Sequence, residues 1–447
     1  MAPRLHEPVA RRPRHTHPHL NDTPQQRKVK AALLSRLPRL PHTPRRTNLS
    51  VLSLDWALAA RLYWRAEIGV HKATLIYSPK FATYSMGEGH PLRPERLDLT
   101  FQLMQAYRVF DSPRIDWQQP SAAPKELLLK IHSPDYVDIT RALGEGESVD
   151  APWRYGLATP DNPIFPGMYE ASALCVGGSV LAADLMMDGK SKVAFNIGGG
   201  LHHAHRSRAA GFCVFNDPAI AIAHILERAG GDARVAYIDI DAHHGDGVQE
   251  AFYDSDRVLT ISLHETGRYL FPYYSGFVEE TGIKDGVGYS VNVPLSPYTD
   301  DETYLWAFCE VVPPLMGAFR PDFVFSQLGA DTHYRDPLTH LALTTFGYQE
   351  VVKKIRECGG KWIACGGGGY DLEVVPRAWT LAFAVMAELD LADEIPPPAA
   401  ARYPDSGGHL HDTAVPQPAS DLRAGVKAVA ERAVEQVKRL IFPRHGL

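Results

Sequence analysis

The sequence has few cysteines, and they do not form pairs. The 447 residues include five, without a C-x-x-C motif: Cys175, Cys213, Cys309, Cys358 and Cys365. This odd, scattered set excludes the disulfide framework of a small secreted protein and is typical of reduced thiols in the cytoplasm. We therefore expect a cytoplasmic protein in which Cys213 and Cys365 are small, buried, apolar side chains.

Long apolar runs and a strong charge of one sign are also missing. We expect no run to reach the length of a transmembrane helix, and no apolar signal-peptide core follows Met1. The formal net charge of −6 argues against nucleic-acid binding by the whole chain. Neither a membrane nor a nucleic acid is therefore expected as a partner. The length and the 45% hydrophobic content suit one large α/β domain with appended segments.

In the segment Arg234–Gly247, an apolar strand pattern passes directly into acids and histidines. A strand points alternate side chains to opposite faces, so Asp239, Asp241 and His243 can converge on one side where the strand ends. Carboxylate and imidazole groups suit zinc or a similar divalent ion. The segment therefore predicts a metal site, and the alternative is an ordinary surface turn after a strand.

Four other short β-rich runs also end in glycine or polar residues. They cover residues 192–203, 257–264, 323–331 and 361–370, and their last residues are His203, His264, Asp331 and Tyr370. Helical patterns lie between them, at 218–229, 301–319 and 347–358. Alternating strands and helices predict a parallel α/β sheet. Ligands of such sheets bind beyond the carboxyl ends of the strands, so we expect one site built from several strand ends.

Between His71 and Leu391, the chain resembles the zinc-dependent histone deacetylase family, most closely the bacterial acetoin-utilisation-type deacetylases. The resemblance implies a single-domain, three-layer α/β/α fold with a mostly parallel central sheet, the arginase/deacetylase fold. It rests on the order and spacing of seven motifs: GHPLRPERL (89–97), HSPDYV (132–137), GGGLHHA (198–204), GFCVFND (211–217), DIDAHHGDG (239–247), LGADTHYRDPL (328–338) and GGGGY (366–370).

The expected metal ligands are Asp241, His243 and Asp331. Three protein ligands leave one position open, which is typical of a catalytic rather than a structural zinc. An open zinc lowers the pKa of bound water and polarises a carbonyl, so an amide can be attacked near neutral pH. We expect Zn²⁺ here, with Fe²⁺ as the alternative in the cell.

His202 and His203 are the expected acid–base pair, because one histidine can take a proton from water and one can deliver a proton to the leaving amine. The resemblance implies that His203 is the general base and acid and that His202 is its electrostatic partner. It also implies that Asp239 and Asp246 are carboxylates that fix the histidine tautomers. The alternative is a pair of satisfied core histidines.

Tyr370 ends a tetraglycine run that lets the backbone approach a bound substrate closely. Its hydroxyl would stabilise the oxyanion that forms during amide hydrolysis. The family sometimes carries histidine at this position, with weak activity as the consequence, so the tyrosine favours an active enzyme. An ordinary glycine turn followed by a packing tyrosine is the alternative.

The resemblance also implies a substrate tunnel. Gly211, Phe212 and Phe271 match its walls, where aromatic faces would hold an aliphatic acyl-lysine stem. Asp161 matches the acid that grips the substrate backbone at the rim. Arg96 matches an arginine of an internal channel that helps acetate to leave. The alternatives are core phenylalanines, a turn-forming aspartate and a surface arginine.

Two structural potassium sites are implied as well. The first would use the backbone of Asp239 and His243 together with Asp241, Ser262 and Leu263. The second would use the backbone of Phe252 and Val258.

The expected activity is metal-dependent hydrolysis of an amide, removing acetyl or a similar acyl group from lysine side chains of a protein or peptide. The manganese ureohydrolases share this fold but need two metals; here Gly245 and His333 stand where their second metal would require carboxylates. An acetylpolyamine amidohydrolase acting on small acetylated amines stays open, because the motifs do not separate it from a protein deacetylase. A catalytically silent binding module is the alternative of a different class.

Three segments are expected along the chain. Residues 1–70 form a basic, Pro/Arg/His-rich extension, disordered except for a short amphipathic helix at Asp55–Arg65. Residues 71–393 form the catalytic domain. Residues 394–447 form a linker and an amphipathic helix at Ser420–Ile441, with Val426, Val429, Val434 and Val437 near helical spacing. Packing of that helix on the core and homo-oligomer formation through it both stay open.

Overall fold

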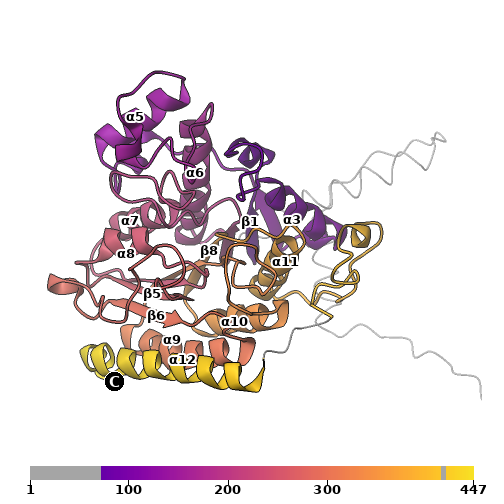
Figure 1. The fold of residues 1–447 in the computed structure, drawn as a ribbon. Helices are drawn as coiled ribbons and strands as arrows, with labels where there is room; N and C mark the ends of the chain where they lie inside the picture. The colour runs from indigo at the N-terminus through magenta and orange to yellow at the C-terminus, as the bar shows by residue number, and fades with distance from the viewer. Residues whose placement is uncertain (1–71, 414–418) are drawn as a thin grey trace, which may run out of the picture. The chain divides into compact units, whose positions relative to one another are not determined.

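The computed structural model describes residues 72–413 and 419–447. The predicted N-terminal extension lies outside these described residues. Within them the chain forms one eight-stranded sheet with the order β2-β1-β3-β8-β7-β4-β5-β6 (Figure 1). All neighbouring strands are parallel. The strands are β1 (Ala73–Ile76), β2 (Ile115–Gln118), β3 (Val193–Asn196), β4 (Val235–Asp239), β5 (Val258–Glu265), β6 (Ser290–Leu295), β7 (Phe323–Gln327) and β8 (Lys361–Cys365).

The register of the central strands brings the last residues of β3, β8, β7 and β4 into one row beside Ser262, which lies within β5. Asn196 of β3 pairs with Cys365 of β8, which pairs with Gln327 of β7. Gln327 in turn pairs with Asp239 of β4, and Asp239 pairs with Ser262 of β5. Strands β4, β5 and β7 are buried along their whole length, as expected for parallel strands covered on both faces. The loops that follow β3, β8, β7 and β4 therefore start at the same level.

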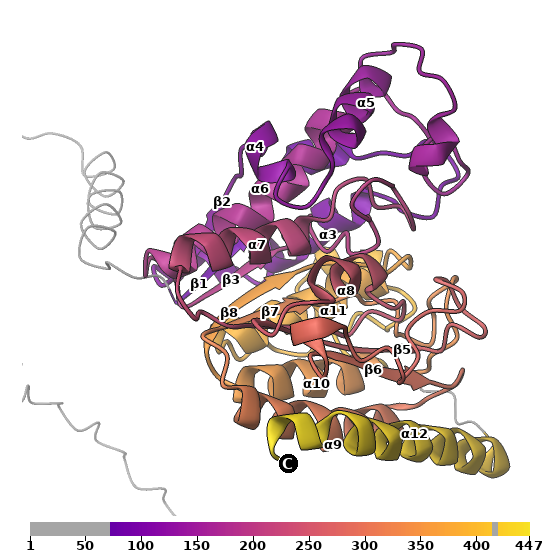
Figure 2. The same ribbon diagram turned by 90° about the vertical axis from the view of Figure 1, so that its left-hand side faces the viewer.

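Helices cover both faces of the sheet and give the predicted three-layer fold. Helices α6 and α7 lie on one side, and α9, α10 and α12 lie on the other (Figure 2). Helix α11 packs between α10 and α3. The α-helices are α3 (Glu95–Ala106), α4 (Lys125–Leu128), α5 (Pro134–Gly144), α6 (Met168–Met187), α7 (Asp217–Ala229), α8 (Asp246–Phe252), α9 (Asp301–Phe319), α10 (Thr345–Glu357), α11 (Val374–Ala387) and α12 (Ser420–Leu440). Short 3-10 helices are η1 (Pro79–Thr83), η2 (Val109–Asp111), η3 (Pro152–Tyr155), η4 (Lys284–Gly286), η5 (Ala399–Arg402) and η6 (Phe442–His445).

Helix α6 corrects one expectation from the sequence. Its 20 residues are long and apolar enough to cross a membrane, although no run of that length was expected. The structure gives a different reason for this composition, because 72% of the apolar window is buried inside the fold. The helix packs against α5, α7, β3 and β8. A helix enclosed on nearly all sides becomes apolar all round.

The C-terminal helix α12 packs on the core, against α9 and β6. Its ion pairs join Arg423 to Asp300 and Glu302. The buried face of this helix consists of Val426, Ala430, Ala433, Val434 and Val437. It differs from the four valines of the sequence pattern, because Val429 is only partly buried whereas Ala430 and Ala433 are buried. Association of copies through this helix remains a prediction.

The segment that begins at Glu394 also packs on the domain. Ile395, Tyr403 and Leu410 are buried in a small cluster with Leu103 of α3 and Leu381 of α11. This segment is therefore part of the folded body rather than a free linker. Among the five free cysteines, Cys213 and Cys365 are buried, as predicted.

Candidate active site

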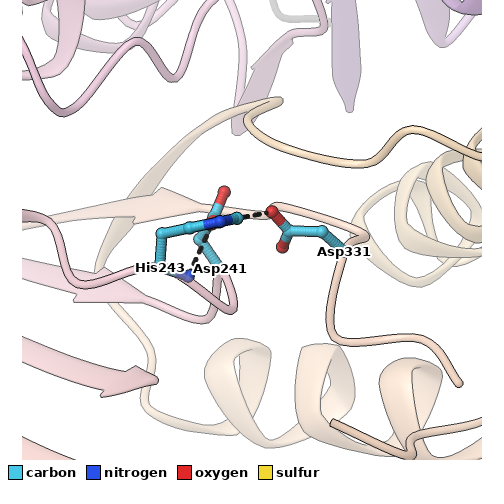
Figure 3. Close-up of side chains that lie close together, drawn as sticks. All are labelled: Asp241, His243 and Asp331. Carbon is cyan, nitrogen blue, oxygen red and sulfur yellow. Dashed lines mark hydrogen bonds and ion pairs between the residues drawn. The ribbon is translucent and has the colours of Figure 1, made fainter. Parts of the chain in front are cut away.

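Three potential metal ligands converge on the loops that follow β4 and β7. One ligand atom from each of Asp241, His243 and Asp331 lies within 4.8 Å of the others, and all three residues are buried. His243 Nδ1 lies 3.1 Å from Asp241 Oδ1 and 2.9 Å from Asp331 Oδ2 (Figure 3). The structure therefore brings together the ligand set that the sequence pattern predicts.

The second oxygen of each aspartate is held by fixed donors. Asp241 Oδ2 accepts hydrogen bonds from Gln327 Nε2 and from the Gly368 amide, both at 2.7 Å. Asp331 Oδ1 accepts a 2.8 Å hydrogen bond from the Ala242 amide. These bonds orient the carboxylates around the imidazole. In the sequence, Gln327 is recognisable only as the polar last residue of an apolar strand. Its contact with Asp241 could not be predicted from that pattern.

The charge of the cluster suits a divalent cation. Burial, followed by the charge of Asp241, raises the pKa of Asp331 to about 6. Burial would also raise the pKa of Asp241, but the neighbouring His202 and His243 outweigh it and hold that pKa well below the usual range. Two buried carboxylates and one imidazole are an oxygen and nitrogen donor set that fits zinc or a similar ion.

The His202–His203 pair lies beside this cluster, with each ring anchored by a different carboxylate. His202 Nδ1 is 2.8 Å from Asp239 Oδ2, and His203 Nδ1 is 2.7 Å from Asp246 Oδ1. The two Nε2 atoms are 3.0 Å apart. Tyr237 donates a 2.6 Å hydrogen bond to Asp239 Oδ2 and so fixes that carboxylate. Both histidines therefore have one ring nitrogen occupied and the other directed towards its neighbour.

The pair is electrostatically asymmetric. Burial would lower the pKa of His202, but the charges of Asp239 and Asp241 outweigh it and raise this pKa to about 9. Burial, together with the charge of His202, lowers the pKa of His203 to about 4. At neutral pH His202 is then cationic and His203 is neutral. Neighbouring groups whose pKa values are pushed apart can divide the roles of acid and base between them.

Buried polar residues of α7 and its N-terminus hold the loop that carries the two histidines. Asp217 accepts hydrogen bonds from the amides of Gly200 and Leu201, at 3.0 and 2.8 Å. Asn216 Nδ2 donates to the carbonyls of His202 and Ala204, at 3.1 and 2.9 Å. The motif GFCVFND ends in these two residues, but the sequence alone gives no indication of what they contact.

The glycine run before Tyr370 passes directly over the ligand cluster. A Cβ atom on Gly368 would lie 2.0 Å from Asp331 Oδ2, so only glycine fits there. Gly367 has a φ of +146°, which also requires glycine. Burial raises the pKa of the Tyr370 hydroxyl well above its usual value, so this group stays protonated and can donate a hydrogen bond.

Tyr370 borders a cavity of about 20 Å³ that is also lined by residues of the ligand cluster and the histidine pair. Its ring meets the ring of Phe212 edge to face, with centroids 5.8 Å apart. His202, His203, Asp241 and His243 line the same cavity. Groups capable of proton transfer, of metal binding and of hydrogen-bond donation therefore face one small space.

Two of the three predicted tunnel residues, Gly211 and Phe212, line this cavity, and the third, Phe271, contacts it through His203. Phe212 lines it, and the ring of Phe271 packs edge to face on His203 at a centroid distance of 5.0 Å. Gly211 lies against the rings of His203 and Phe271. A Cβ atom there would meet His203 Cδ2 at 2.4 Å and Phe271 Cε1 at 2.7 Å. Gly211 and Phe271 also line a larger groove of about 960 Å³, which Asp161 borders with an exposed side chain.

Arg96 is buried, which excludes the alternative of a surface arginine. Its Nη1 donates to the carbonyls of Gly367 and Gly369, at 2.7 and 2.9 Å. Its guanidinium lies over the Trp379 ring, 5.2 Å from the centroid. Arg96 therefore fixes the glycine run through these two hydrogen bonds.

The residues expected at the two potassium sites lie on and around β4 and β5. Asp239 and Ser262 pair across β4 and β5, next to Leu263, whose carbonyl accepts a 3.1 Å hydrogen bond from Tyr304. Phe252 ends α8, and Val258 begins β5. A role of either group in binding a monovalent ion remains a prediction.

Comparisons with known proteins agree over most of the chain. The histone deacetylase domain matches residues 90–386. The acetoin utilization protein AcuC of Bacillus subtilis (strain 168) is 46% identical over 332 residues, which are 73% of this chain and 84% of that protein. The protein of the same name from Staphylococcus aureus (strain MRSA252) is 42% identical over 319 residues, or 70% and 81% of the two chains.

Solved structures agree as well. The crystal structure of an HDAC homolog from Aquifex aeolicus has a TM-score of 0.74 and 32% sequence identity, and the match covers 81% of this chain and 100% of that chain. The structure of an HDAC homolog complexed with SAHA gives the same values. The chain therefore belongs to the histone deacetylase family and is a deacetylase, a hydrolase of amide bonds.

Proposed function

We propose that this protein removes acetyl or similar acyl groups from lysine side chains and that Asp241, His243 and Asp331 hold a catalytic Zn²⁺. The observation that carries this proposal is the shared cavity, since Asp241 and His243 of the ligand cluster, the two anchored histidines and Tyr370 all line it. A silent binding module would have no need to keep all of these groups. Fe²⁺ is the alternative metal for the same ligands.

A divalent ion held by these ligands would polarise the amide carbonyl and lower the pKa of water. His203 is the base that takes a proton from the attacking water, and it later returns a proton to the leaving amine. The neutral state of His203 near pH 7 supports this role. Asp246 holds its Nδ1, so the transfer uses Nε2, the atom that faces His202. His202, fixed by Asp239, supplies positive charge next to the developing negative charge.

Tyr370 donates a hydrogen bond to the oxyanion, and its protonated hydroxyl supports this role. Phe212, Gly211 and Phe271 guide the aliphatic stem of the substrate, and Asp161 binds the substrate backbone outside the cavity. Arg96 keeps the glycine run in place behind Tyr370. Two potassium ions, bound by the residues described above, would stabilise the strand ends that carry the site.

Hydrolysis of small acetylated amines is the second candidate, since the same groups would act on them. The experiment that separates the two is a side-by-side assay of the purified full chain on acetyl-lysine peptides and on acetylated polyamines. A higher kcat/KM for the peptides is the expected result. A clear preference for the polyamines would overturn the assignment to lysine, while no hydrolysis of either set would favour the silent module.

A further inference from the structure

The loop that follows β7 carries more than the expected metal ligand Asp331. Asp336, a buried residue of the same loop, accepts a 2.9 Å hydrogen bond from the Tyr370 amide through Oδ2. Its Oδ1 accepts a 2.9 Å hydrogen bond from the Leu338 amide, which fixes the carboxylate. Residues 331–336, the ligand loop, therefore set the positions of both Asp331 and the Tyr370 backbone.

His333, in the middle of the ligand loop, is bonded through both ring nitrogens. Its Nδ1 accepts a 3.2 Å hydrogen bond from the Arg335 amide, so the ring proton lies on Nε2. Nε2 donates a 2.9 Å hydrogen bond to Asp412 Oδ2. The side chains of His333 and Asp412 are both only 3% exposed. His333 therefore anchors the loop to Asp412.

Asp412 is itself held by two other elements. Its Oδ2 also accepts hydrogen bonds from the backbone amide and the hydroxyl of Thr345, the first residue of α10, at 2.8 and 2.9 Å. Its Oδ1 accepts a 3.0 Å hydrogen bond from Arg377 Nη2 on α11. Arg377 is completely buried, and its Nη1 donates to the Leu410 carbonyl at 2.9 Å. Asp412 is therefore a fixed point to which His333 is tied.

A second contact joins the ligand loop to the same part of the chain. Arg335 Nη2 donates a 2.6 Å hydrogen bond to Asp405 Oδ2, and Arg335 Nε donates a 3.1 Å hydrogen bond to Asp371 Oδ2. Asp371 directly follows Tyr370, so Arg335 also links the tyrosine to Asp405. The Asp405 side chain is 56% exposed, so this contact is weaker than the buried pair of His333.

The segment that supplies both of these aspartates lies beyond residue 386, where the match to the histone deacetylase domain ends. It lies beside α3 and α11 (Figure 1), on which Ile395, Tyr403 and Leu410 are buried. The Ile395 amide donates to the Gly408 carbonyl, and the Leu410 amide donates to the Asp393 carbonyl, both at 2.8 Å. The segment is thus anchored by its own contacts, so it can hold the ligand loop in place.

We propose that Asp412 and Asp405 are positioning residues of the active site. They hold the ligand loop through His333 and Arg335, and so keep the aspartate ligand and the oxyanion donor in place. The inference rests on the proposed function, because it takes Asp331 to be a metal ligand. It goes beyond that function by giving residues outside the matched family domain a role in metal retention.

The test follows the release of Zn²⁺ from the loaded full chain to a coloured chelator. His333→Leu removes the buried anchor and should release Zn²⁺ about tenfold faster than wild type, as is typical when a partner that orients a metal ligand is lost. His333→Gln keeps an N–H donor for Asp412 and should recover most of the difference. Asp412→Asn should also speed release. Its addition to His333→Leu should have little further effect, because the contact is already absent.

The same variants are assayed for hydrolysis of an acetyl-lysine peptide. We expect kcat to fall while KM changes by less than about twofold, because the ligand loop contacts groups that act on the reacting amide and not the tunnel residues. His224→Leu is the matched control, since it removes a His–Asp pair of similar length, to Asp184 on α6. It should change neither the release of Zn²⁺ nor kcat.

Asp405→Asn decides the question if His333→Leu does not fold, because this side chain is more than half exposed. It should speed the release of Zn²⁺ by about threefold. Asp188→Asn, in a surface contact with Arg228, is its control and should leave the release unchanged. Release from Asp405→Asn at the wild-type rate would overturn the positioning role of Asp405.

Failure of this inference differs from failure of the proposed function. Wild-type release and kcat in folded His333→Leu and Asp412→Asn, with only a lower unfolding temperature, would overturn the inference and leave the segment a purely structural addition. Faster release from His333→Leu that neither aspartate variant shares would assign the effect to the loop alone and overturn the role of the segment. Active wild type without a bound divalent ion would overturn the proposed metal site itself, and this inference with it.

Discussion

His202 and His203 place their Nε2 atoms 3.0 Å apart, while their Nδ1 atoms contact carboxylates of two different elements. Asp239 ends β4, and Asp246 begins α8. The two histidines are adjacent in the chain, yet the charges of Asp239 and Asp241 raise the pKa of His202, whereas burial, together with the charge of His202, lowers the pKa of His203. The structure therefore assigns them different protonation states, which makes their functions separable by mutation.

Replacing His203 with alanine should remove proton transfer. We expect kcat to fall by roughly a hundredfold to ten-thousandfold, the usual contribution of a general acid or base. Metal content should stay unchanged, because His203 is not one of the three ligands. His224→Ala, a histidine paired with Asp184 on α6, serves as the control and should retain activity. A His203→Ala rate within about twofold of wild type would contradict the role of the base.

Tyr370→Phe should keep the fold and the metal but lose one hydrogen bond to the oxyanion. The expected decrease in kcat is on the order of a hundredfold or more. A hydroxamate should still bind the variant, because its two oxygens would bind the metal and the three metal ligands are unchanged. Its affinity should fall less than the rate. Activity close to wild type would make Tyr370 a residue that packs on Phe212 and has no part in catalysis.

Removal of a metal ligand should abolish binding of the ion. Wild type should contain one divalent metal per chain by elemental analysis, and Asp331→Ala should contain almost none and be inactive. Asp138→Asn, a substitution at an exposed carboxylate, is the control and should retain the metal. Two stoichiometric transition metals in active wild type, or full activity of Asp331→Ala, would be incompatible with the proposed site.

Potassium should affect activity if the two predicted monovalent sites form. We expect activity to rise or fall as K⁺ replaces Na⁺ at constant ionic strength, because the first group of residues includes Asp241 and His243. The measurement is kcat/KM across a wide range of K⁺ concentration. A flat response would argue against a functional role of these sites.

Asp412 should contribute to stability in a pH-dependent way. Burial would raise its pKa, but contacts with His333, the Thr345 amide and Arg377 outweigh it and hold the pKa below the usual range. Because the folded pKa lies below the unfolded value of about 3.9, the stabilisation is present above that pH and is lost as the pH falls below it.

Asp412→Asn should therefore lower the free energy of unfolding at pH 7 by about 3 kcal/mol, since it leaves the buried Arg377 without its partner charge. Urea unfolding at several pH values would measure this difference, which should shrink towards pH 3. Asp254→Asn, at a surface ion pair with Lys284, should have little effect. A difference that does not change with pH would show that the charge of Asp412 is not the cause.

The sequence predicts best where polar chemistry directly follows an apolar strand. The ends of β4, β7 and β8 and the whole of α9 agree with the pattern, because each is a largely apolar segment with a clear boundary. The four-residue strands β1 and β2 are too short to show a period. Helix α6 is apolar all round, so it has no polar face that would reveal which side faces solvent.

The sequence pattern does not predict site residues whose hydrogen-bond partners lie far away along the chain. Gln327 and Asp241 are separated by 86 positions, and Asp217 bonds to amides 16 and 17 positions away. Their side chains are recognisable as buried polar groups only when the strands are placed side by side. The direct ligands are recognisable because their own spacing carries the chemistry.

The tight fit of the glycine run has a consequence for the evolution of this chain. Gly368 leaves no room for a side chain next to Asp331, and Arg96 fixes the carbonyls on either side of it. A mutation there would damage the metal ligands and the position of Tyr370 together. Selection for catalysis should therefore keep these positions unchanged, while a descendant that had lost catalysis would be free to accumulate side chains in them. Substitutions in this run would mark such non-catalytic descendants among the relatives of this protein.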